Sequence, residues 1–122
     1  MIAHLTKILL YVKDIEATAE FYSCYFDFTV QREEDDRIVE LVSPHGSMSL
    51  MLHQASKGKK LGQTCVKLVF DVEDVPSFCA RCRERGLEFG SLHRGDGYVF
   101  ANAKDPSNNS ISVSSRAFRG QA

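Results

Sequence analysis

The sequence lacks an excess of charge of either sign, a long apolar run and an export signal. Its 122 residues include 15 basic and 16 acidic side chains, a net charge of −1, so no positive field would attract a nucleic-acid backbone. The longest apolar run, Ile8 to Val12, is far shorter than a membrane-spanning helix requires. We therefore expect neither a nucleic-acid partner nor a membrane partner.

The first residues, Met1 to His4, do not begin a charged and then apolar signal peptide, so we expect a cytoplasmic protein. The four cysteines are then expected to remain thiols. Cys79 and Cys82 have the spacing of a redox or zinc pair, but they fall inside a predicted helix and no second cysteine pair completes a metal site. The remaining cysteines are interpreted as small core residues: Cys24 and Cys65.

The first half of the chain recurs in the second half. The segment from Lys7 to Ile15 is matched by the segment from Lys67 to Val75, which keeps the lysine, valine and aspartate in register. Later in each half, the turn sequence at 43–46 is matched by that at 105–108. The chain is therefore predicted to be a duplicated module.

Each half is predicted to contain one strand, one helix and three further strands. The apolar runs at 5–12 and 65–72 have strand composition, and the aspartates that follow them, Asp14 and Asp74, would each cap a helix. The helices are expected to end near Asp27 and at Gly86. The remaining strands are expected at about 28–33, 36–43 and 47–53, and at about 87–93, 98–103 and 109–115.

Three motifs resemble the vicinal oxygen chelate superfamily, which contains glyoxalase I, extradiol dioxygenases, fosfomycin-resistance enzymes and bleomycin-resistance proteins. The motifs are Leu10 to Ile15 followed by Phe21-Tyr22, Phe70 to Val75, and Lys104 to Asn109. Because these motifs occur in both halves, the resemblance covers nearly the whole chain.

The resemblance implies an α+β fold, in which two tandem βαβββ modules form a curled, cupped mixed sheet with helices on the outer face. The chain would be a single domain over 1–122, with modules at about 1–54 and 63–116 and a tether at 55–62. The concave site of the family is often completed by dimerisation, so we expect a homodimer. The chain departs from the family pattern at Asp27 and Asn108, where glycine is usual.

The resemblance also implies four metal-ligand positions, and the residues found there are not normal ligands of a divalent ion. Lys7 and Lys67 stand in the first strands of the two halves, Ser112 in the last strand, and Leu50 or Met51 at its counterpart. An ammonium group has no lone pair, and two of them would repel a cation. We expect no metal and no other cofactor.

Strand alternation offers another role for these lysines. It places Lys7 with Leu9, and Lys67 with Val69, on faces opposite to apolar faces that would pack on the helices. The lysines would then attract a carboxylate or phosphate group of a small ligand. Alternatively, each lysine reaches water near a strand end or pairs with Glu40.

Aromatic side chains on predicted strands would stack on a flat or apolar ligand: Phe28, Tyr98 and Phe100. Those at helical spacing are predicted to be ordinary core: Phe21, Tyr22, Phe26 and Phe78.

The leading hypothesis is a metal-free binding protein of the bleomycin-resistance type, which holds a small organic molecule without changing it. No catalytic residue is predicted. One alternative is a lyase or dioxygenase of the same superfamily with a displaced metal site drawn from His4, His53, His93 or Glu40. Another is a regulatory module whose concave sheet binds a protein. The predicted ligand-binding residues are Lys7, Leu9, Phe28, Leu50, Lys67, Val69, Tyr98, Phe100 and Ser112.

Overall fold

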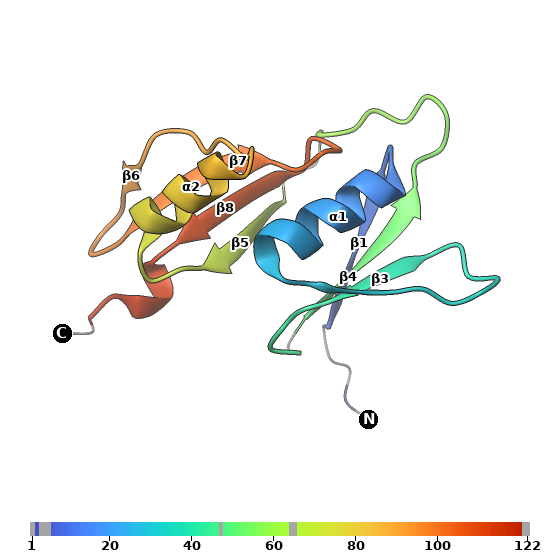
Figure 1. The fold of residues 1–122 in the computed structure, drawn as a ribbon, viewed down its shortest axis with the longest axis horizontal. Helices are drawn as coiled ribbons and strands as arrows, with labels where there is room; N and C mark the ends of the chain where they lie inside the picture. Colours follow the sequence, from blue (N-terminus) through green and yellow to red (C-terminus); the bar gives the residue numbers. More distant parts are fainter. Residues whose placement is uncertain (1, 3–5, 47, 64–65, 121–122) are drawn as a thin grey trace. The chain divides into compact units, whose positions relative to one another are not determined.

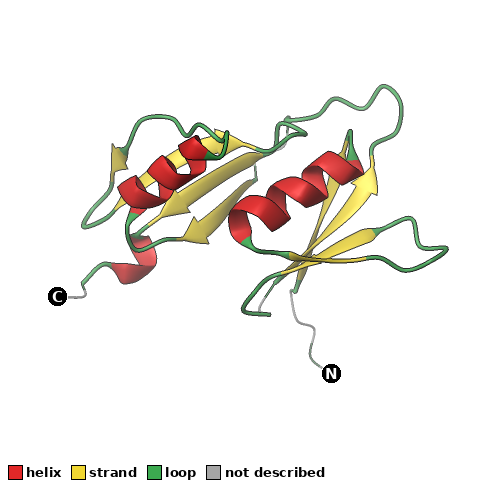
Figure 2. Cartoon of the chain, in the orientation of Figure 1, coloured by secondary structure: helices red, strands yellow, loops and turns green. Residues whose placement is uncertain are grey.

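The computed structural model describes residue 2 and residues 6–46, 48–63 and 66–120, so His4 and Cys65 lie outside the described residues. The chain divides into two compact units, Met1–Gly62 (module 1) and Gln63–Ala122 (module 2). Each contains a four-stranded sheet and one longer helix (Figures 1 and 2). The elements are β1 (Lys7–Val12), α1 (Ile15–Phe26), β2 (Thr29–Gln31), β3 (Val39–Val42), β4 (Ser49–Gln54), β5 (Lys67–Asp71), α2 (Val75–Glu84), β6 (His93–Arg94), β7 (Val99–Lys104), β8 (Ser110–Ser114) and the short 3-10 helix η1 (Arg116–Phe118).

The two sheets have the same topology. The strand order is β1-β4-β3-β2 in module 1 and β5-β8-β7-β6 in module 2. The first strand of each module runs parallel to the fourth, and the other pairs are antiparallel. The predicted α+β fold of two βαβββ modules is confirmed.

One face of each sheet is buried under the helix of the same module. In module 1 the alternating residues Val12, Leu41 and Leu52 are fully buried, as is Tyr22 of α1, which contacts β3 and β4. In module 2 Ile111 and Val113 are fully buried, and α2 contacts β7. This apolar burial, worth about 25 cal/mol per Å², fixes which face of each strand remains for other contacts.

Both helices begin at the predicted aspartate. Asp14 accepts a hydrogen bond from the Ala17 backbone N–H at 3.0 Å, and Asp74 accepts one from the Ser77 backbone N–H at 3.1 Å. The bond from Ser77 is the main cause that lowers the pKa of Asp74. At the other end of α1, Asp27 has the left-handed φ of 60° that explains why glycine is usual there.

The second strand of module 2 is much shorter than predicted. The prediction of a strand at 87–93 was wrong, because Leu87 and Phe89 are buried side chains outside any strand and only His93–Arg94 forms β6. The Phe89 ring lies 6.4 Å from that of Phe78 on α2. Packing against the helix therefore takes this segment away from the sheet ladder, apart from one bond from Gly90 N–H to the Asn102 carbonyl oxygen at 2.9 Å.

The turn between β7 and β8 is built around a buried carboxylate. Asp105 is only 4% exposed and accepts hydrogen bonds from the backbone N–H groups of Ser107 and Asn109 and from the Asn109 side-chain amide. Asn108 in the same turn has a φ of 67°. The aspartate of this family motif therefore fixes the start of β8.

Replacing Asp105 with alanine should lower the free energy of unfolding by roughly 2 to 4 kcal/mol, because buried amide donors lose their acceptor. Urea denaturation measures the change. The exposed helix cap Asp14→Ala is the comparison and should cost about 1 kcal/mol. Equal losses in the two variants would show that the Asp105 turn is not a special anchor.

Candidate functional site

The sheet of module 2 has a second face that is not covered by α2, which we call the open face. The strand register places alternate residues of β5, β7 and β8 together on it. Val69 is 58% exposed there, whereas Ser112 and Ser114 are buried among longer neighbours. The residues of this face are Lys67, Val69, Asp71, Phe100, Asn102, Lys104, Ser110, Ser112 and Ser114.

Both lysines at the implied metal positions donate hydrogen bonds across the sheet. Lys7 Nζ lies 2.8 Å from Glu40 Oε1, which confirms the pairing considered from the sequence, and Lys67 Nζ donates to Asn102 Oδ1 at 3.0 Å. Glu40 and Asn102 occupy equivalent strand positions, since Glu40 is in register with Met51 and Asn102 with Ser112. The ammonium groups are thus held in the same way in each module.

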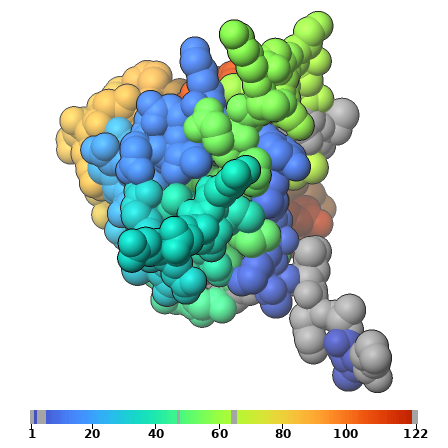
Figure 3. Space-filling view, turned by 90° about the vertical axis from the view of Figure 1, so that its right-hand side faces the viewer, coloured from blue at the N-terminus to red at the C-terminus, as the bar shows by residue number. Residues whose placement is uncertain are grey.

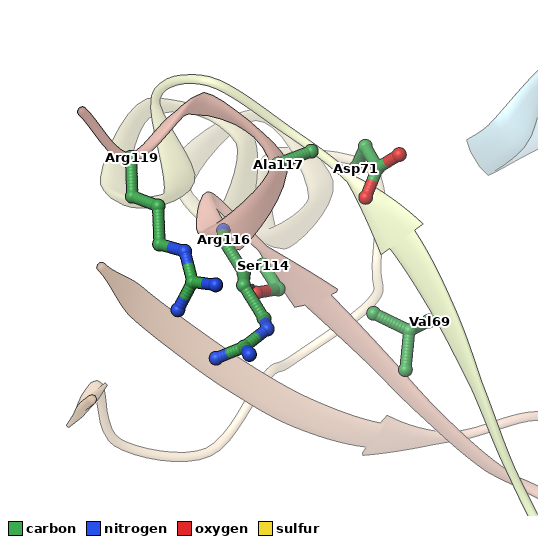
Figure 4. A pocket seen from close by; sticks show the side chains of 6 residues that line it. All are labelled: Val69, Asp71, Ser114, Arg116, Ala117 and Arg119. Atoms are coloured by element: carbon green, nitrogen blue, oxygen red, sulfur yellow. Dashed lines mark hydrogen bonds between the residues drawn. The ribbon is translucent and has the colours of Figure 1, made fainter. Parts of the chain in front are cut away.

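The ends of β5 and β8 and the segment that follows β8 line an open cavity of about 460 Å³ (Figure 4). It is lined by Val69, Asp71, Ser114, Arg116, Ala117 and Arg119. Figure 4 shows the two arginine side chains extending in the same direction, with Asp71 on the other side of the cavity. Among the described residues, Lys7–Glu40 and Arg32–Glu16 form ion pairs, whereas no carboxylate is paired with either cavity arginine.

Local contacts hold Arg116 over the sheet. Its backbone N–H donates to Ser114 Oγ at 3.1 Å, which turns η1 back toward the end of β8. Its guanidinium carbon lies 5.2 Å from the centre of the Tyr98 ring, a distance typical of a cation–π contact. The Tyr98 ring in turn lies so close to Gly95 that a Cβ there would collide with it.

The aromatic residues beside this cavity form a short row. The ring centres of Tyr98 and Phe100 are 6.1 Å apart, and His93 stacks on Phe100 at 5.1 Å. Phe100 and His93 are paired across β7 and β6. An apolar and aromatic wall therefore adjoins the arginines.

The corresponding strand ends of module 1 carry larger side chains. Tyr11 and His53 are paired there, as Asp71 and Ser114 are in module 2, and their ring centres are 5.5 Å apart. Lys59 of the tether places its Nζ 3.9 Å from the centre of the Tyr11 ring. The tether itself is exposed and projects from the surface (green, Figure 3). The two copies thus differ in chemistry at these strand ends.

A second hollow, of about 370 Å³, lies beside α1 in module 1. Its lining includes Glu16, Glu20 and Arg32, and Arg32 is paired with Glu16 at 2.6 Å. Because its one lining arginine already has a carboxylate partner, this hollow offers less to a charged ligand than the cavity of module 2.

The structure separates the predicted ligand-binding residues into three groups. Lys67, Val69, Phe100 and Ser112 share the open face of module 2 with Tyr98 beside them, and Lys7 and Leu9 share the corresponding face of module 1. The other two lie on the helix side of module 1: Phe28, buried beside Tyr22 at 5.9 Å, and Leu50, which is 3% exposed.

Of the six residues that line the cavity, the sequence predicted only Val69 as a site residue and omitted the other five: Asp71, Ser114, Arg116, Ala117 and Arg119. Asp71 and Ser114 follow from strand alternation, which continues the face of Val69 and Ser112 by one step each. Arg116 and Arg119 carry the charge, and their only sequence signal is a three-residue spacing directly after the last strand. Their position depends on the turn of η1, which the strand pattern does not predict.

The residues at the implied metal positions do not fit a divalent ion. Both ammonium groups donate to oxygen atoms, and Ser112 Oγ donates to the Ala101 carbonyl oxygen at 3.1 Å. Within residues 2, 6–46, 48–63 and 66–120, no three His, Cys, Asp or Glu side chains are grouped to hold a metal. Of the candidates for a displaced site, Glu40 is bound by Lys7 and His93 is stacked on Phe100.

The cysteine pair of α2 shows no sign of activation. Cys82 is 4% exposed, and partial burial raises the pKa of the Cys79 thiol. A redox-active thiol requires a lowered pKa, so this pair does not constitute a site.

A sequence profile and several solved structures of other proteins match this chain. The sequence profile described as Glyoxalase/Bleomycin resistance protein/Dioxygenase superfamily matches residues 2–113. No curated protein sequence matches the chain. In the part of the chain that the structure describes, no helix is long and apolar enough to cross a membrane.

Several solved structures resemble the chain over most of its length. The antibiotic binding protein TnmS3 from Streptomyces sp. CB03234 has a TM-score of 0.74 and 24% identity, with 92% of this chain and 94% of that chain covered. Lactoylglutathione lyase from Agrobacterium tumefaciens has a TM-score of 0.70 and 19% identity, with 92% of each chain covered. A superfamily member from Sphaerobacter thermophilus has a TM-score of 0.74 and 20% identity, covering 93% of this chain and 97% of that chain. These likenesses establish the fold.

Adding Mn²⁺, Ni²⁺ or Zn²⁺ to the chelator-treated protein should leave the melting temperature unchanged, because a ligand stabilises a protein only if the folded state binds it. Thermal unfolding with and without each ion measures this, and Mg²⁺ serves as the ionic-strength control. A rise in the melting temperature with one of these ions, saturating at one ion per chain, would contradict the conclusion that these residues do not fit a divalent ion.

Proposed function

The chain belongs to the Glyoxalase/Bleomycin resistance protein/Dioxygenase superfamily, and on this basis we propose that it binds a small organic molecule without a metal ion and without changing it chemically. The observation that carries the proposal is the cavity on the open face of module 2, lined by apolar and charged side chains. A concave, partly apolar site with a few placed polar groups is the usual form of a small-molecule site. We propose sequestration as its function.

The side chains at the implied metal positions support binding over catalysis. The metal enzymes of this superfamily need a divalent ion, and here the lysines donate to Glu40 and Asn102 instead of leaving lone pairs for one. Similarity to both a lyase and an antibiotic binding protein leaves either role open at the level of fold. The two lysines that donate hydrogen bonds at the implied metal positions favour binding over catalysis.

We further propose that the protein is a cytoplasmic homodimer. The superfamily often completes its concave sites by dimerisation, as the sequence resemblance implied. A partner chain would lengthen the wall of a cavity that a single module lines with six residues.

Naphthylmethanol, an uncharged aromatic probe, should shift the amide NMR signals of β5, β8 and η1 and be recovered intact by mass spectrometry. Val69→Trp should weaken its binding about tenfold or more, because a bulky ring enters the cavity wall. Val69 is 58% exposed, so the variant should fold.

The matched control is Val66→Trp, since Val66 is 52% exposed in the same module but does not line the cavity. It should leave the affinity unchanged. Equal effects of the two variants, or conversion of the probe to a product, would contradict the proposal.

A further inference from the structure

The charged side chains that line the cavity of module 2 are two arginines and one aspartate, and neither Lys7 nor Lys67 is among the lining residues. Arg116 and Arg119 contribute two guanidinium groups, and Asp71 contributes one carboxylate on the other side. Among the described residues neither arginine has a carboxylate partner, so the cavity holds one net positive charge. A ligand with one negative charge would neutralise it.

From this pattern we propose that the ligand is a small organic acid with a single negative charge, whose anionic group lies between Arg116 and Arg119 and whose apolar part lies on Val69 and Ala117. This inference rests on the proposed binding function and names the chemical class of its ligand. Guanidinium groups bind carboxylates through paired, charge-assisted hydrogen bonds.

The scaffold prepares Arg116 for this contact before a ligand arrives. Its backbone is fixed by the bond to Ser114 Oγ, and its side chain lies over Tyr98. A side chain that is already ordered loses less conformational entropy on binding, so more of the interaction contributes to affinity. Because Ser114 Oγ accepts the Arg116 N–H, its own hydroxyl hydrogen can be donated to the ligand.

Asp71 further restricts the chemical class of the ligand. A group with two negative charges would meet the Asp71 carboxylate as well as the arginines, and the like charges would repel. Conversely, a hydroxyl or amine on the ligand would find an acceptor in Asp71. The cavity therefore favours a monoanion over a phosphate dianion.

Module 1 provides an internal comparison. At the same register positions it has Tyr11 and His53, with Lys59 placed over the Tyr11 ring. The aromatic side chains there take the place of the smaller Asp71 and Ser114. The described strand ends of module 1 therefore do not repeat the combination of Asp71 and Ser114 found in module 2.

Three naphthalene probes with the substituent at the same ring position test the class: naphthoate, naphthyl phosphate and the uncharged naphthylmethanol. Calorimetry at about pH 8 keeps the phosphate a dianion. Naphthoate should bind about tenfold more tightly than the alcohol, because of the paired guanidinium contacts, and more tightly than the phosphate. An order in which the phosphate or the alcohol binds more tightly than naphthoate would overturn the inference.

Variants assign the effect to the arginines. The double variant Arg116→Met and Arg119→Met should remove the preference for naphthoate over naphthylmethanol, with both affinities measured on the variant itself. The charge-matched control replaces Arg83 and Arg94, which are exposed in the same module and do not line the cavity. This control variant should retain the preference for naphthoate. Any small loss of affinity should be no larger than the loss that added salt produces by screening.

Asp71→Asn should strengthen binding of the phosphate more than that of naphthoate, because it removes the opposing carboxylate. If naphthylmethanol binds the cavity but naphthoate gains nothing from the arginines, the inference fails and the binding function stands. If none of the probes binds the cavity, both fail.

Discussion

In each sheet of this protein one face packs on the helix of the same module, and the chemistry of the molecule follows from that constraint. Apolar residues on alternate positions of the strands pack on α1 or α2, which leaves the intervening positions on the other face. In module 2 these positions carry polar and charged residues together with Val69 and Phe100, and the chain that leaves β8 turns back over them through η1. The candidate site is therefore a product of strand alternation and of one short tertiary turn.

The duplicated modules show how one scaffold acquires different chemistry at equivalent positions. Both retain a lysine in the first strand that donates across the sheet, to Glu40 in module 1 and to Asn102 in module 2. These exposed contacts add little stability by themselves, but they hold an ammonium group at each of the first-strand positions that the family resemblance implies for a metal ligand. The copies diverge at the strand ends, where Tyr11 is replaced by Asp71 and a cavity is lined by arginines.

Much of the fold was predictable because it depends on local rules. The strand alternation, the aspartate caps and the left-handed position of Asp27 all follow from neighbouring residues. The errors arose where packing between distant segments decides: Phe89 packs against α2 and shortens β6, and Phe28 packs against Tyr22 instead of reaching the other face. The cavity arginines escaped prediction for the same reason, since Arg116 is positioned by Ser114 and Tyr98.

The most direct test of a metal-free, anion-binding second module is a crystal structure with bromonaphthoate, using the anomalous signal of bromine to locate the ligand. The account predicts a bromine peak against Val69 and Ala117, with the carboxylate oxygens at about 3 Å from the guanidinium groups of Arg116 and Arg119. A peak outside this cavity, or a carboxylate bound instead by Lys67, would contradict it.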